Sequence, residues 1–68
     1  MTDLSLIDRI LNGIALIRKY EPNADFSAEH DTIYFGSYET REQMTAEEQA
    51  QMDEWLWLEE YDSWAHFV

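Results

Sequence analysis

The sequence contains no cysteine, one proline, two glycines and only four basic residues among its 68. Without cysteine, neither a disulfide nor a thiolate zinc site can stabilise the fold. A chain this short buries only roughly 60% of its unfolded surface, so it needs unusually good packing or self-association. We therefore expect one small domain, residues 1–68, held together by aromatic side chains (15% of residues), with a homodimer as the alternative remedy.

Long hydrophobic runs are missing too. No stretch approaches the 18 or so apolar residues that a membrane-spanning helix requires. The N-terminus, MTDLSLIDRI, lacks the basic start and the small-residue cleavage site of a signal peptide. The sequence therefore predicts a cytoplasmic protein.

Acids outnumber bases by 15 to four, which gives a net charge of −11. Phosphate groups are contacted mainly by Lys and Arg, so this balance argues against direct binding to DNA, RNA or an anionic membrane. The expected partners are basic proteins or metal ions. The alternative is that the negative charge only keeps a small protein soluble.

The clearest predicted helix lies in residues 3–22. Its apolar residues recur at three- and four-residue spacing, which indicates one apolar face. That face consists of Ile7, Ile10, Leu11, Ile14 and Ile17, with Leu4 and Tyr20 at its ends. Asp3 or Ser5 can cap the start, and Pro22 ends the segment because it disfavours helix at the preceding residue. Gly13 lowers helix propensity, so we expect a close contact with a neighbouring element there.

A short hairpin and a second helix follow. Residues 32–35 are β-branched or aromatic and precede Gly36, and a weaker alternating pattern runs from residue 24 to 28, with a turn at residues 29–31 between them. The polar residues 36–43 are predicted to form a loop. A helix is predicted in residues 44–55, because Thr45 and Glu48 have the spacing of a capping box.

The C-terminal tail, WLWLEEYDSWAHFV, has two interpretations. In one, the second helix continues from Asp53 to Glu60. In the other, which the aromatic enrichment favours, residues 55–58 and 63–68 are the strands of a second hairpin. Most of the tail is then expected in the core, with one tryptophan and Tyr61 exposed.

These elements predict an α+β single domain in the order helix–hairpin–helix–hairpin. The N-terminal helix is expected to pack across a small antiparallel sheet, with rings from both hairpins against it.

Residues 30–68 resemble a group of small phage and prophage proteins through HDTIYFG, the helix TAEEQAQMDE and the tail WLWLEEYDSWAHFV. Those proteins also end in a helix, a Trp-rich strand, an acidic turn and a strand containing Ser-Trp. In their pattern a glycine closes the helix just before the first tryptophan, where this chain has Glu54. The resemblance implies a fold and a phage setting, and so a host cytoplasm, but no activity. Size and charge alone are similar to those of acidic phage inhibitors that mimic DNA, including anti-CRISPR proteins.

The acids are concentrated in the second half of the chain. Residues 39–62 contain nine acids and one base, a net charge of 1 − 9 = −8. Four of these acids lie in residues 45–54, a helix about 15 Å long, which gives one carboxylate per roughly 4 Å of axis. One DNA strand carries a phosphate per about 3.4 Å. The density therefore suits a DNA mimic, and the alternative is an ordinary solvated helix surface.

Signals for catalysis or metal binding are weak. The turn Glu29-His30-Asp31 has metal-ligand residue types, but consecutive residues rarely converge on one ion. Asp62, Ser63 and His66 have the residue types of a hydrolase triad, but neighbours on a strand point to opposite faces. We expect no enzyme activity, no cofactor and no metal site.

The function predicted from the sequence is that of a small interaction protein of phage type. Its acidic face would bind a basic host protein, which could be a nucleic-acid-binding one, and block its site. Trp57 and Tyr61 would be apolar anchors, because Trp and Tyr are enriched at binding hot spots. The carboxylates would be those of Glu47, Glu48, Asp53, Glu54, Glu59, Glu60 and Asp62. The alternative is a homodimer or assembly component whose acidity serves solubility.

Overall fold

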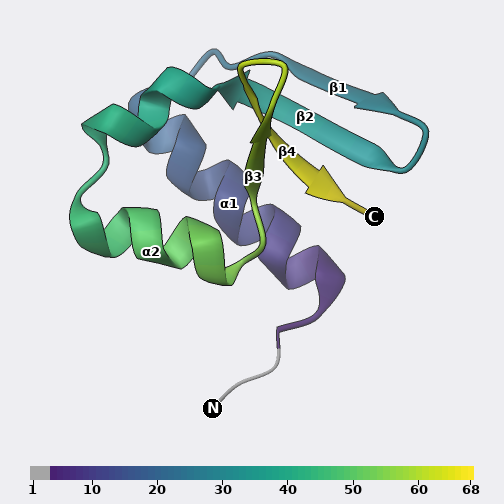
Figure 1. Ribbon diagram of the computed structural model, residues 1–68, viewed down its shortest axis with the longest axis horizontal. Coiled ribbons are helices and arrows are strands. Elements are labelled where there is room, and N and C mark those ends of the chain that lie inside the picture. The colour runs from purple at the N-terminus through teal and green to yellow at the C-terminus, as the bar shows by residue number, and fades with distance from the viewer. Residues whose placement is uncertain (1–3) are drawn as a thin grey trace.

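The computed structural model describes residues 4–68. Helix α1 (Leu6–Tyr20) precedes strands β1 (Phe26–Glu29) and β2 (Thr32–Ser37), the 3₁₀ helix η1 (Tyr38–Gln43), helix α2 (Ala46–Glu54) and strands β3 (Leu58–Glu60) and β4 (Ser63–Phe67). The two hairpins join into one antiparallel sheet with the strand order β1-β2-β4-β3. The predicted α+β class and the order helix–hairpin–helix–hairpin are confirmed (Figure 1).

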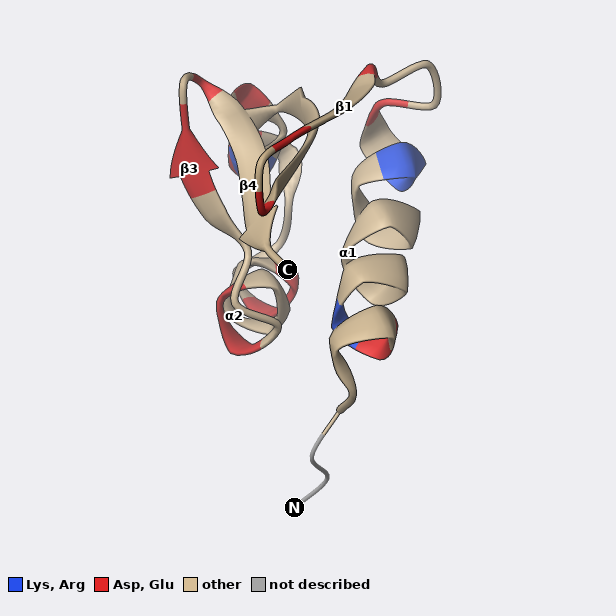
Figure 2. Cartoon of the chain, turned by 90° about the vertical axis from the view of Figure 1, so that its right-hand side faces the viewer, with Lys and Arg blue, Asp and Glu red and all other residues tan. Residues whose placement is uncertain are grey.

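The core lies between the sheet and the helices. Figure 2 shows α1 on one side of the sheet and α2 below it. Phe35 of β2 and Trp64 of β4 are opposite each other in the sheet, and both rings are buried in this layer. The buried cluster consists of Ile10, Ile17, Phe35, Met44, Met52, Trp57 and Trp64. Rings from both hairpins therefore meet the helical layer, as predicted.

Helix α1 begins at a serine cap and buries less of its apolar surface than predicted. Ser5 Oγ accepts a hydrogen bond of 3.1 Å from the Asp8 N–H, which confirms one of the two predicted caps, whereas Asp3 lies outside the described residues. The prediction that one apolar face of this helix is buried is wrong in part, because the side chains of Ile7 and Leu11 are 58% and 56% exposed. The helix is rotated so that Gly13, which can admit a large ring, faces the core instead.

The first hairpin matches the prediction, but the segment after it does not. Strands β1 and β2 are joined by a turn at His30 and Asp31, with His30 at a φ of 57°. Gly36 has a φ of 68°, and the register of β2 against β4 shifts next to it. The predicted loop is the helix η1, because the Thr40 hydroxyl donates to the Ser37 carbonyl at 2.6 Å and closes a tight turn.

Helix α2 begins at the predicted capping box, in which Glu48 N–H donates to Thr45 Oγ1 at 3.1 Å and Thr45 N–H donates to Glu48 Oε1 at 3.0 Å. It ends in a Schellman motif. Leu56 has a φ of 66°, and the N–H groups of Leu56 and Trp57 donate to the carbonyls of Asp53 and Met52. Leu56 thus takes the left-handed position that glycine usually fills.

The tail is a hairpin, which decides between the two interpretations. Its first strand is Leu58–Glu60 rather than residues 55–58, because the Schellman motif occupies the residues immediately before it. The expected exposure of one tryptophan is wrong. Trp57 and Trp64 are buried and Trp55 is half-buried, whereas Tyr61 is 83% exposed.

Candidate protein-binding face

Charge is divided between two regions of the molecule. Helix α1 carries three of the four basic residues, Arg9, Arg18 and Lys19. No Lys or Arg occurs in α2, β3 or β4. Figure 2 shows the acids of β3 on the side of the molecule away from α1, and those of α2 below the sheet. The candidate face is therefore formed by η1, α2 and the β3–β4 hairpin.

Glu48 joins α2 to α1 through side-chain hydrogen bonds. Its carboxylate accepts hydrogen bonds from Lys19 Nζ at 2.7 Å, from the Tyr20 hydroxyl, and from the Thr45 N–H. The bonds from Lys19 and Tyr20, and then the one from Thr45, lower the pKa of Glu48 to about 2. Its side chain is only 13% exposed, so Glu48 fastens α2 to α1 and offers little surface to a partner.

Asp53 forms a bidentate pair with Arg41 of η1. The guanidinium nitrogens lie 3.1 and 3.2 Å from the two carboxylate oxygens. This hydrogen bonding is the main reason why the pKa of Arg41 is raised. The pair joins η1 to α2 and neutralises Asp53, whereas Glu47 and Glu54 are exposed on the same helix.

The β3–β4 turn presents its side chains in a strained conformation. Tyr61 and Asp62 have φ values of 55° and 60°, as a type I′ turn requires, and such values are unusual for a residue as bulky as tyrosine. Glu59 Oε2 accepts the Asp62 N–H at 3.0 Å. Glu60 accepts the Tyr34 hydroxyl at 2.8 Å, which raises the pKa of Tyr34 to about 12. Glu59 is thus held by the turn backbone and Glu60 by Tyr34 of the sheet, while Tyr61 projects into solvent.

Trp57 is not an anchor for a partner. It is 2% exposed, and its indole N–H donates to the Arg9 carbonyl at 2.9 Å. It packs edge-on against the His66 ring, with 5.2 Å between the ring centroids. The predicted role is therefore wrong, because the indole fills the space that Gly13 leaves on α1.

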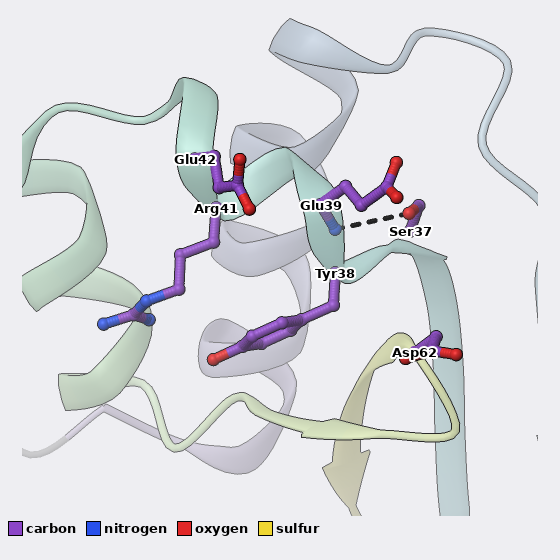
Figure 3. A pocket seen from close by; sticks show the side chains of 6 residues that line it. All are labelled: Ser37, Tyr38, Glu39, Arg41, Glu42 and Asp62. Carbon is purple, nitrogen blue, oxygen red and sulfur yellow. Dashed lines mark hydrogen bonds between the residues drawn. The ribbon is translucent and has the colours of Figure 1, made fainter.

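A cavity of about 420 Å³ lies between η1 and the β3–β4 turn. It is lined by Ser37, Tyr38, Glu39, Arg41, Glu42 and Asp62 (Figure 3). The Tyr38 N–H donates to the Asp62 carbonyl at 3.0 Å, which fixes the turn against η1. In Figure 3 the Arg41 side chain extends toward α2, where Asp53 binds it, and away from the carboxylate of Asp62.

Glu39 and Glu42 are cavity residues that the predicted site omitted. The count of nine acids in residues 39–62 included them, but a loop assignment gave no reason to place them beside Asp62. Among residues 4–68, no ion pair engages Glu39, Glu42 or Asp62. The cavity lining thus combines three carboxylates with the Tyr38 ring, groups that can bind a guanidinium or ammonium ion through charge-assisted hydrogen bonds and cation–π contact.

The residue types considered for catalysis are kept apart. Ser63 donates to the Gly36 carbonyl at 2.8 Å, whereas His66 is buried in the opposite face of β4 with Nε2 2.9 Å from the Trp55 carbonyl oxygen. His30 is exposed in its turn. Within the described chain, no three His, Asp or Glu side chains form a group that could hold a metal ion. None of the helices described is long and apolar enough to span a bilayer.

No protein-family model matches the chain, and no curated protein or solved structure matches it either. The resemblance of residues 30–68 to phage proteins therefore stays a prediction, and the functional argument depends on the geometry described above.

Proposed function

We propose that this protein is a small interaction protein whose acidic face binds a basic surface of another protein and blocks it. The carrying observation is the cavity beside the β3–β4 turn, where Glu39, Glu42 and Asp62 have no ion-pair partner among residues 4–68. An arginine or lysine of the partner would enter this cavity and lie against the Tyr38 ring.

The surrounding residues support a protein partner rather than a free cation. Tyr61 is exposed next to Asp62, and an exposed tyrosine contributes apolar contact area to an interface. Glu47 and Glu54 of α2 and Glu59 of β3 are exposed and would steer a basic surface toward the cavity. Asp53 and Glu60 would act mainly through the bonds that position Arg41 and Tyr34.

Proteins with strongly basic surfaces include those that bind nucleic acid through phosphate contacts. A host protein of that class, blocked by a DNA-like array of carboxylates in the host cytoplasm, is the partner that we propose. The resemblance to small phage proteins supports this setting. Direct binding to nucleic acid is not proposed, because the face carries Arg41 as its one base and Asp53 occupies it.

The test is affinity capture from a nuclease-treated bacterial lysate, eluted by a salt gradient and identified by mass spectrometry. A variant with Glu39→Gln, Glu42→Gln and Asp62→Asn removes the cavity charges. We expect the wild type to retain a nucleic-acid-binding protein that moderate salt releases, and the cavity variant to lose it. The purified partner should then bind nucleic acid less well in the presence of the wild-type protein.

A matched control removes three charges elsewhere. Asp25→Asn, Glu29→Gln and Asp31→Asn lie around β1, and all three residues are exposed. This variant has the same net charge as the cavity variant, so it should still capture the partner. Equal loss from both variants would show that net charge alone matters, and recovery of the bait alone would overturn the proposal.

A further inference from the structure

Helix α1 packs on its own core with one face and leaves an outer apolar stripe exposed. The residues that face the core are Ile10, Gly13, Ile14, Leu16, Ile17 and Tyr20. The outer stripe consists of Ile7, Leu11 and Arg18, and Ile14 lies half-buried at its boundary with the core. Its alternating three- and four-residue spacing is the a/d pattern of a helix that pairs with another helix. Ile7 and Leu11 are more than half exposed.

The outer stripe is also where two copies of this acidic chain can approach each other. Residues 10–17 contain no charged side chain, and Figure 2 shows α1 without acids along this length. The acids of β3 lie on the other side of the molecule, where two copies with a net charge of −11 would repel. A basic partner would not be attracted to this stripe, because the ends of the stripe carry charges of both signs rather than a net negative charge.

We propose that α1 pairs with α1 of a second copy in antiparallel orientation, through the outer stripe, to form a two-fold symmetric dimer. The end charges decide the direction. Asp8 lies in the first turn and Arg18 in the last, and neither forms an ion pair within residues 4–68. An antiparallel pair places Asp8 of each copy beside Arg18 of the other, whereas a parallel pair would place like charges together.

The dimer is small and therefore weak. Fifteen helical residues span about 22 Å, so the interface falls at the low end of known sizes. A dissociation constant on the order of 10–100 µM is expected. The two acidic faces would point away from the dimer axis, and a partner with two basic sites could engage both.

Analytical ultracentrifugation from about 5 to about 500 µM protein tests self-association. We expect a monomer–dimer equilibrium for the wild type and a monomer for Leu11→Glu. The matched control is Leu56→Glu, because Leu56 is 58% exposed, follows α2 and undergoes the same change of charge. Circular dichroism confirms that each variant is folded. The proposal would be overturned if the wild type stayed monomeric over this range, or if Leu11→Glu and Leu56→Glu raised the dissociation constant of the dimer equally.

Charge exchange tests the direction independently. Asp8→Arg and Arg18→Asp should each weaken the dimer about tenfold, and the double variant should restore it because the end charges pair again. Failure of the double variant to recover would refute the antiparallel arrangement. Salt screens both the end-charge attraction and the repulsion between the acidic chains, so all the proteins are compared at one ionic strength.

Single cysteines report the orientation directly, because the chain has no other thiol. Ile7→Cys and Arg18→Cys proteins are mixed and oxidised, and the products are resolved by mass spectrometry. An antiparallel pair brings residues 7 and 18 of different copies together and gives the mixed disulfide. Products that join each variant only to itself would contradict this arrangement.

Discussion

The indole of Trp57 occupies the place where a side chain at Gly13 would begin. A Cβ atom built on Gly13 would lie 2.0 Å from Trp57 Nε1 and 2.4 Å from Cε2, well inside any permitted contact. The same Nε1–H donates to the Arg9 carbonyl at 2.9 Å. One missing side chain on α1 thus lets a tryptophan from the α2–β3 connection pack and hydrogen-bond directly on the helix backbone.

Gly13→Ala should therefore destabilise the protein, although alanine favours helix by about 1 kcal/mol. The methyl group must displace the buried indole and break its hydrogen bond, so a net loss of about 2 kcal/mol is expected in urea unfolding. In a Trp57→Leu background the same change should be neutral or stabilising, because the clash is gone. Equal effects in both backgrounds would show that the contact is not responsible.

Glu48 should make stability depend on pH below the ordinary range of a glutamate. Its pKa is about 2 in the folded protein and 4.5 for a free side chain, so its contribution is complete above pH 4.5 and disappears as the pH falls toward 2. Glu48→Gln should be less stable than the wild type at pH 7, and urea midpoints should converge near pH 2. Glu47→Gln, exposed in the same turn, is the control. A difference that stays constant over this range would contradict the assignment.

Tyr34 should titrate late because its hydroxyl donates a hydrogen bond to the Glu60 carboxylate. Its pKa is raised from 10 to about 12, so the neutral tyrosine contributes stability below pH 10 that is lost as the pH rises toward 12. Glu60→Gln removes the charged acceptor and should lower the pKa seen in ultraviolet titration. The pKa of Tyr20 is also raised, by its bond to Glu48, so both proteins carry Tyr20→Phe, and a late-titrating tyrosine that persists in the Glu60→Gln protein would contradict the assignment. Tyr61→Phe, next to Glu60, controls for overlapping tyrosine absorbance.

The β3–β4 turn should trade stability for binding. Tyr61→Asn with Asp62→Gly supplies residues that accept a positive φ, so the free energy of unfolding should increase by about 1 kcal/mol. The same double variant removes the exposed ring and the cavity carboxylate of Asp62, so partner capture should fall. A variant that gains no stability would show that the turn is unstrained, and one that binds normally would remove both residues from the proposed face.

Local signals in the sequence determined α1, α2 and the existence of the hairpins. The capping box of α2 and the serine cap of α1 depend on residues close together in the chain. Such spacing sets backbone hydrogen bonds directly, which is why these predictions are confirmed. The cysteine-free composition likewise left aromatic packing as the means of stabilisation.

Only the tertiary structure decided which side chains these elements bury. Helix α1 has apolar residues on more than one face, and a hydrogen bond between Trp57 and Arg9, 48 positions apart, accompanies the burial of the face containing Gly13. The same packing removes Trp57 from the surface and leaves Leu11 on it. Contacts across the fold likewise engage Glu48 with Lys19 and bring Asp62 beside η1. Burial depends on such distant contacts, whereas periodicity within a helix marks a surface as apolar without saying what will cover it.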